Sequence, residues 1–107
     1  MPNETVSEWL RNKGFSTSDI DFIETILTFT STAKQLGNKL DEINQTFQRS
    51  FLDKKAEINP NLTFSQFEKY LQDNGLFIEL NELLIRCKAQ GLCVDICNQL
   101  LESQLTK

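Results

Sequence analysis

The chain of 107 residues contains no histidine, so it lacks both the usual general base of enzymes and the most common metal ligand. Its four glycines are isolated from one another, which excludes a glycine-rich loop that would cradle phosphates. The sequence also contains none of the common metal-binding motifs. We therefore expect that the protein is not an enzyme and that it binds no cofactor and no metal.

The chain also has no run of about 18 apolar residues, and we expect no membrane span. Its first ten residues, MPNETVSEWL, lack a basic segment followed by an apolar one, so we expect no signal peptide. An odd number of cysteines, three, without an export signal indicates thiols that stay reduced. Together these features predict a cytoplasmic protein.

Basic residues are in the minority, because 11 Lys and Arg face 15 Asp and Glu and leave a formal net charge of -4. The densest basic stretch contains Arg49, Lys54 and Lys55, and it is interrupted by Asp53 and Glu57. Proteins that bind nucleic acid usually present a basic face. We therefore expect no direct contact with nucleic acid.

Glycine and proline are scarce, at four and two residues, so few turns are available. Hydrophobic residues make up 39% of the chain and include eight Phe, enough for one modest core. No segment alternates between apolar and polar residues over a useful length, as a strand would. The composition thus predicts a single all-α domain over residues 1–107, a bundle of five or six helices.

Local capping signals mark most of the expected helix boundaries. Residues 5–8, 16–19 and 63–66 each pair Ser or Thr with Asp, Glu or Gln three positions later, as in a capping box. An apolar residue follows Gly14, Gly75 and Gly91, the pattern of a helix stop. The signals predict a short first helix, a second from Ser16, a third from Thr63 to Gly75, a fourth from Phe77 to Gly91 and a fifth from Val94 to Leu105.

The longest apolar stripe runs from about residue 20 to residue 52 at the 3-4 spacing of an amphipathic helix. Gly37 and Asn38 are its weak point, because Asn38 and Asp41 are spaced as a further capping box. The stripe nevertheless keeps its phase across Gly37, which no apolar residue follows. We therefore expect one continuous, long amphipathic second helix of roughly 50 Å. A break at Gly37 with a fold-back is the alternative.

A helix of that length extends beyond what a compact domain of 107 residues covers, so the second half of the stripe needs a partner. Its large apolar residues are Leu36, Leu40, Ile43, Phe47 and Phe51. Left bare, they would form an exposed patch on the order of several hundred Å², more than monomers usually tolerate. We predict that these five residues form a protein interface and that the protein is a homodimer.

Three cysteines, Cys87, Cys93 and Cys97, lie within eleven positions. Their spacing matches no common zinc or iron–sulfur pattern, and a tetrahedral zinc would need a fourth ligand from Asp95 or a second subunit. Cys93 lies near an expected helix N-terminus, where a reactive thiolate is favoured. The phase of the cysteines with neighbouring leucines favours a third interpretation, simple core packing, which we adopt over the metal and redox alternatives.

Two short stretches resemble known motifs. Residues 55–67 resemble an EF-hand loop, but Lys55, Pro60 and Gln66 stand where calcium binding needs a ligand, a glycine and a glutamate. Residues 6–15, VSEWLRNKGF, resemble the first helix of sterile-alpha-motif domains, whereas the pattern that follows differs from that family. Neither resemblance implies a function for this chain.

The missing catalytic groups and the surplus apolar stripe lead to one functional expectation. We expect a small cytoplasmic regulatory or adaptor module that acts by binding protein and whose first partner is its own second copy. The alternative is an acidic regulator of a nucleic-acid-binding machine, acting as a mimic of the phosphate backbone or linked to transcription, and the net charge of -4 supports it. An exposed apolar patch would favour protein docking, and a clustered acidic surface would favour mimicry.

Overall fold

The structure is a computed structural model that describes residues 4–105 and contains only helices in that range. Six α-helices and one 3-10 helix follow in the order α1 (Val6–Asn12), α2 (Thr17–Gln35), η1 (Gly37–Lys39), α3 (Leu40–Ser50), α4 (Phe64–Asp73), α5 (Leu80–Ala89) and α6 (Val94–Leu105). This arrangement confirms the predicted all-α class and the presence of a long second helix.

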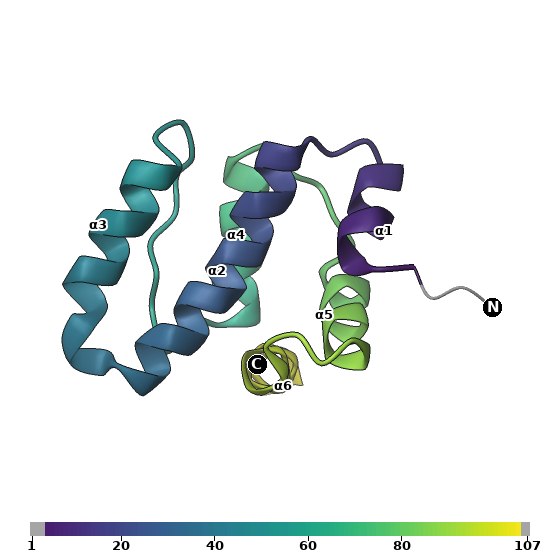
Figure 1. The fold of residues 1–107 in the computed structure, drawn as a ribbon. Coiled ribbons are helices and arrows are strands. Elements are labelled where there is room, and N and C mark those ends of the chain that lie inside the picture. Colours follow the sequence, from purple (N-terminus) through teal and green to yellow (C-terminus); the bar gives the residue numbers. More distant parts are fainter. Residues whose placement is uncertain (1–3, 106–107) are drawn as a thin grey trace.

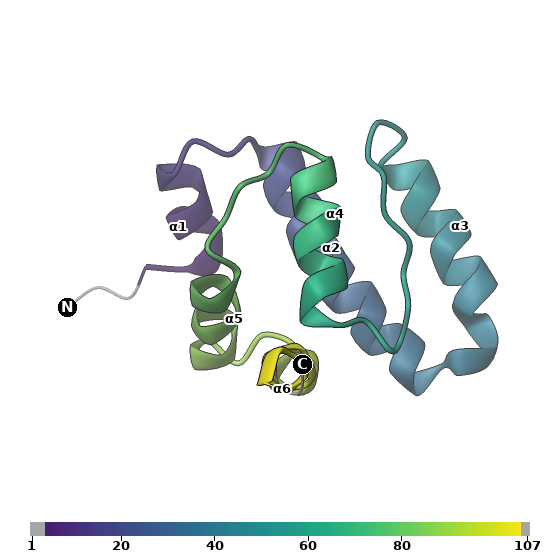
Figure 2. The ribbon, with the colours of Figure 1, turned by 180° about the vertical axis from the view of Figure 1, so that it is seen from behind.

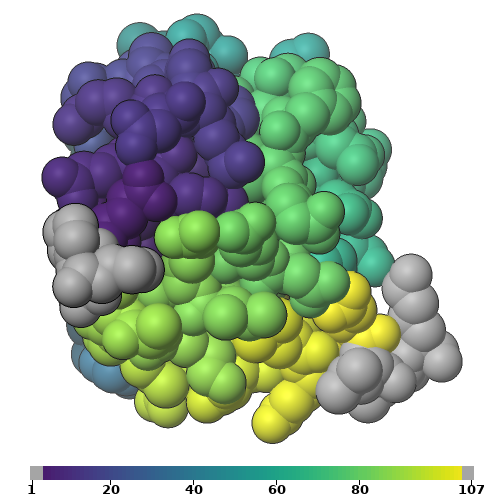
Figure 3. Space-filling view, turned by 90° about the vertical axis from the view of Figure 1, so that its right-hand side faces the viewer, coloured from purple at the N-terminus to yellow at the C-terminus, as the bar shows by residue number. Residues whose placement is uncertain are grey.

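The helix α2 runs through the middle of the molecule (Figure 1). On one side α3 lies beside it in the opposite direction, and on the other side lie α1 and α5. Seen from behind, α4 lies in front of α2 (Figure 2). The connection from α3 to α4 runs through the space between α3 and α4. The helix α6 crosses beneath and packs against α5, α2 and α4. From the side, α1 lies above the chain that leads from α5 to α6 (Figure 3).

One contiguous apolar core joins these helices. The helix α2 buries Ile23 and Ile26 along one face, α5 contributes Leu83 and Leu84, and α6 contributes its fully buried Leu100. The two faces of α2 therefore have different neighbours, since α1 and α6 cover one and α3 covers the other.

Local capping decides most of the helix boundaries, as the sequence predicts. The three capping boxes Thr5–Glu8, Ser16–Asp19 and Thr63–Gln66 are all formed. The glycines that end α1, α4 and α5 are Gly14, Gly75 and Gly91, with φ of 97°, 75° and 74°. The prediction for Phe77 is wrong, because α5 begins at Leu80 and Phe77 precedes it with 76% of its surface exposed.

The expectation of a continuous helix through Gly37 is also wrong. The helix α2 ends at Gln35, Leu36 turns out of the helix with φ -123° and ψ 60°, and α3 folds back along α2. The capping box expected from Asn38 is not formed, since α3 begins after Lys39 without a side-chain cap. The long stripe is thus divided between two antiparallel helices.

Aromatic contacts between α2 and α3 give the physical reason for the fold-back. The ring of Phe47 stacks on Phe22 with centroids 5.8 Å apart, and Phe51 meets Phe22 edge-on at 5.5 Å. Phe29 closes the other side of Phe47 at 6.1 Å. A lone continuous helix would leave these rings in water, whereas the hairpin buries Phe47 almost completely.

Candidate protein-binding groove

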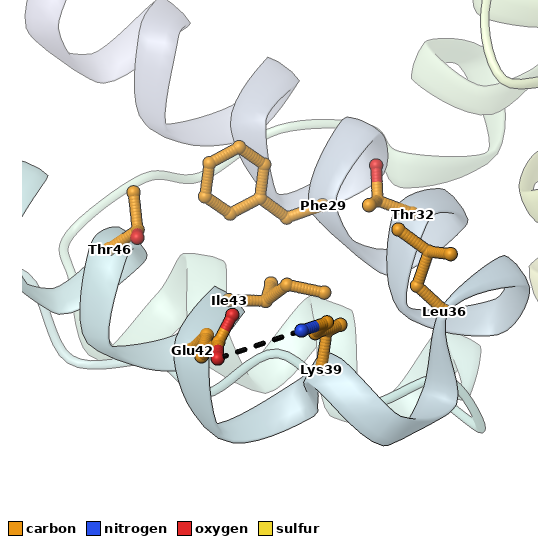
Figure 4. A pocket seen from close by; sticks show the side chains of 7 residues that line it. All are labelled: Phe29, Thr32, Leu36, Lys39, Glu42, Ile43 and Thr46. Carbon is orange, nitrogen blue, oxygen red and sulfur yellow. Dashed lines mark ion pairs between the residues drawn. The ribbon is translucent and has the colours of Figure 1, made fainter.

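An apolar groove of about 400 Å³ lies between α2 and α3 at the hinge end of the hairpin. The helix α2 provides Phe29 and Thr32, the hinge provides Leu36 and Lys39, and α3 provides Glu42, Ile43 and Thr46. Figure 4 shows the ring of Phe29 and the side chains of Leu36 and Ile43 around this space. The groove can therefore accept an apolar side chain from outside.

Differences in side-chain size explain why the hairpin is open at this end. Where Phe22, Phe47 and Phe51 meet, bulky rings fill the space between α2 and α3. Beside the ring of Phe29 the lining residues include Thr32 on α2 and Thr46 on α3, whose small side chains leave the space open (Figure 4). Apolar surface therefore stays open to solvent beside Leu36, whose side chain is 50% exposed.

The rim of the groove carries one charge of each sign. Lys39 Nζ lies 3.9 Å from Glu42 Oε1, and both side chains are well exposed, at 51% and 72%. An exposed pair of this kind contributes about 0–1 kcal/mol to stability. The two side chains are thus free to exchange partners, and the rim selects neither an acidic nor a basic ligand.

The five residues predicted as an interface are divided between this groove and the core. Leu36 and Ile43 line the groove together. Leu40 and Phe51 are half-buried against the core, and Phe47 is only 1% exposed. The expectation that Phe47 forms part of an uncovered surface is wrong, because Phe22 and Phe29 cover it within the same chain.

The sequence pattern does not predict Phe29, Thr32 or Thr46 as site residues. The spacing of the apolar residues could have indicated Phe29, because Phe29 and Ile43 each lie seven positions from Leu36. A turn at Leu36 therefore places the two side chains opposite each other. That signal becomes useful only once the position of the turn is known.

The three cysteines gather where α5 meets α6. Cys87 and Cys97 are buried, as expected for core residues, whereas Cys93 is half-buried and adopts a positive φ of 48° before α6. A hydrogen bond from the Cys87 thiol, helped by the charge of Lys88, lowers the pKa of Cys97, and the same contact raises the pKa of Cys87. Burial raises the pKa of Cys93. Residues 4–105 hold no group of three side chains arranged to bind a metal ion.

The sequence matches no protein-family model, no curated protein and no solved structure. In the described part of the chain, no helix is both long enough and apolar enough to cross a membrane.

Proposed function

We propose that the protein is a small regulatory or adaptor module that acts by binding protein, with the α2–α3 groove as its docking surface. The groove itself carries the proposal, since Phe29, Leu36 and Ile43 hold an apolar space of about 400 Å³ open to solvent. A partner that covers it gains about 25 cal/mol for each Å² of apolar surface removed from water. The cytoplasmic location expected from the reduced thiols is part of this proposal.

The first partner in this proposal is a second copy of the chain. A two-fold interface needs a surface that is complementary to itself. Leu36 provides a half-exposed apolar side chain beside an apolar groove, and Lys39 and Glu42 provide one charge of each sign on its rim. Two copies related by a two-fold axis can satisfy both requirements with the same residues.

Sedimentation velocity from micromolar to millimolar concentration tests this proposal. We expect a reversible dimer, weakened at least about tenfold by Ile43→Asp, because a carboxylate buried in an apolar interface loses its hydration. Ile85→Asp is the matched control, since Ile85 lies on α5 and is 58% exposed. A wild-type protein that stays monomeric throughout would contradict the proposal, as would equal effects of the two variants.

The alternative, an acidic regulator of a nucleic-acid-binding machine, rests on the net charge of -4 alone. The groove, by contrast, is a specific surface with named residues. We therefore retain only the protein-binding proposal.

A further inference from the structure

The hinge between α2 and α3, residues 36–39, has neither a side-chain cap nor a glycine with positive φ. The helices α1, α4 and α5 are each followed by a glycine with positive φ, whereas Gly37 does not adopt one. The helices α1, α2 and α4 begin with capping boxes, whereas neither η1 nor α3 has a side-chain cap. The local features that favour a break at the hinge are thus limited to Gly37 and Asn38, which disfavour a helix interior.

The sequence on both sides of the hinge is compatible with one helix. Ala33, Leu40 and Phe47 follow one another at intervals of seven, so the apolar stripe continues through Gly37 without a change of phase. The contacts that oppose a continuous helix come from residues distant in sequence, chiefly the stacking of Phe47 on Phe22. Local preference and tertiary packing thus disagree at the hinge.

We propose that the hinge opens and that two copies of the chain exchange their α1–α2 units, while α2 and α3 of each copy join into one helix. The inference rests on the proposed self-association and gives its geometry. In this dimer α2 of each copy packs on α3 to α6 of the other, so Phe22 stacks on the partner's Phe47. The contacts of α2 with α3 and with α6 are thereby remade between two chains, whereas α1 and α2 keep their mutual contact within one chain.

The dimensions of the molecule indicate why a second copy of the chain covers α2 once the hinge has opened. A single helix from Thr17 to Ser50 would be about 50 Å long at 1.5 Å per residue. The longest dimension of the compact chain is 43 Å, so an opened monomer holds α1 and α2 away from their own core. The surface that fits the bared face of α2 best is the same surface on another copy.

The extent of the contact favours exchange over docking of two closed surfaces. Seven side chains line the groove. A stable interface uses about 20–30 residues on each side. Exchange supplies the larger contact, because it reuses the packing of α1 on α5 and of α2 on α3 and α6. Leu36 and the open groove then lie where the two long helices cross.

Two substitutions of Gly37 are expected to shift the equilibrium between the closed monomer and the exchanged dimer in opposite directions. No atom lies within 4 Å of a Cβ placed on Gly37, so the closed form accepts Gly37→Ala. Because Ala is favoured over Gly inside a helix, we expect the dimer association constant to rise about tenfold. Gly37→Pro suits the first position of a helical turn but disrupts a helix interior. We expect it to lower that constant about 100-fold or more and to leave the monomer helical.

Complementation between two defective chains tests the exchange directly. Phe22→Asp and Phe47→Asp each place a carboxylate in the aromatic contact, and each variant alone is expected to unfold. When the two are refolded together, an exchanged heterodimer contains one lobe with both wild-type rings and one lobe with both substitutions. We expect the mixture to regain up to about half of the wild-type helical circular dichroism, in a species with the mass of a dimer.

The outcomes separate this inference from the proposed function. A wild-type dimer that Gly37→Pro leaves unchanged, together with no recovery in the mixture, would overturn the exchange and keep self-association. A wild type and a Gly37→Ala variant that both stay monomeric at millimolar concentration would overturn both. A dimer association constant that falls from Ala to Gly to Pro at position 37, together with recovery of helical circular dichroism in the mixture, supports both.

Discussion

At the scale of single residues, Thr30 places a hydroxyl in the middle of the core. Its side chain is fully buried on α2, and its Oγ1 has no hydrogen-bond partner. Thr28 and Thr32 on the same helix each donate to the carbonyl oxygen four residues earlier, at 3.0 Å. The hydroxyl of Thr30 therefore lost its hydration on folding without a replacement.

We expect Thr30→Val to raise the free energy of unfolding by about 1 kcal/mol, because a methyl group of similar shape replaces an unsatisfied hydroxyl. Urea denaturation followed by circular dichroism measures the change. Thr32→Val is the matched control, since it removes a hydroxyl that is hydrogen-bonded and only half-buried. A loss of stability in Thr30→Val would show that the hydroxyl contributes an interaction of its own.

The cysteines differ in exposure, and their chemistry should follow that difference. Cys93 is half-buried, whereas Cys87 and Cys97 are 1% and 0% exposed. We expect iodoacetamide to modify Cys93 first in the native protein, because its thiol is the most exposed. The rate should rise with pH as the thiolate forms, and the rise should come at higher pH than for an ordinary cysteine because burial raises the pKa of Cys93. Mass spectrometry over time measures this order, and Cys93→Ser should remove the first modification. Equal rates for all three thiols would contradict the core positions of Cys87 and Cys97.

At the scale of the elements, side-chain amides hold the non-helical backbone in place. Asn44 on α3 accepts from Ile58 N at 2.7 Å and donates to Ile58 O at 3.0 Å. Asn74 pairs with Lys55 in the same way, at 2.8 and 2.9 Å. Each amide thus satisfies both polar groups of a residue in the long connection between α3 and α4, which has no backbone ladder of its own.

We expect Asn44→Ala to lower the free energy of unfolding by about 2 kcal/mol, because it leaves the backbone groups of the buried Ile58 without partners. Gln45→Ala, at the neighbouring exposed position, is the control and should change stability little. Hydrogen exchange gives a second readout, since the amide of Ile58 should lose protection in Asn44→Ala alone. Unchanged protection of Ile58 would show that the connection is held by its apolar contacts.

At the scale of the whole molecule, α1 is attached to α5 by contacts between the two ends of the chain. The guanidinium of Arg86 lies over the ring of Trp9 at 4.8 Å. Gln90 accepts from Val6 N at 3.2 Å and donates to Glu4 O at 2.7 Å. Because Trp9 is also part of the single apolar core, α1 is not an independent unit.

We therefore expect one cooperative unfolding transition for the whole chain. Trp9 is the only tryptophan and reports on α1, whereas far-ultraviolet circular dichroism reports on all helices. The two signals should give the same midpoint in urea, as two-state unfolding requires. An earlier transition in tryptophan fluorescence would contradict the single domain predicted from the sequence.

Local interactions explain which parts of this fold the sequence determines by itself. A capping box joins residues three positions apart, and a glycine with positive φ acts within one turn, so the boundaries at Ser16, Thr63 and Gly75 are readable before any tertiary contact is known. Helical periodicity likewise predicts which faces are apolar, including those of the buried Cys87 and Cys97. The all-α class follows from these signals.

Only the tertiary structure decides the break at Leu36 and the groove beside it. No side-chain cap forms at the hinge, and the contact that bends the chain joins Phe22 to Phe47, which are distant in sequence. Periodicity finds Leu36 and Ile43 as apolar positions, but it cannot show that Phe29 faces them across a hairpin. The physical reason is that apolar burial depends on which surfaces meet in space, and a stripe on one helix does not specify what covers it.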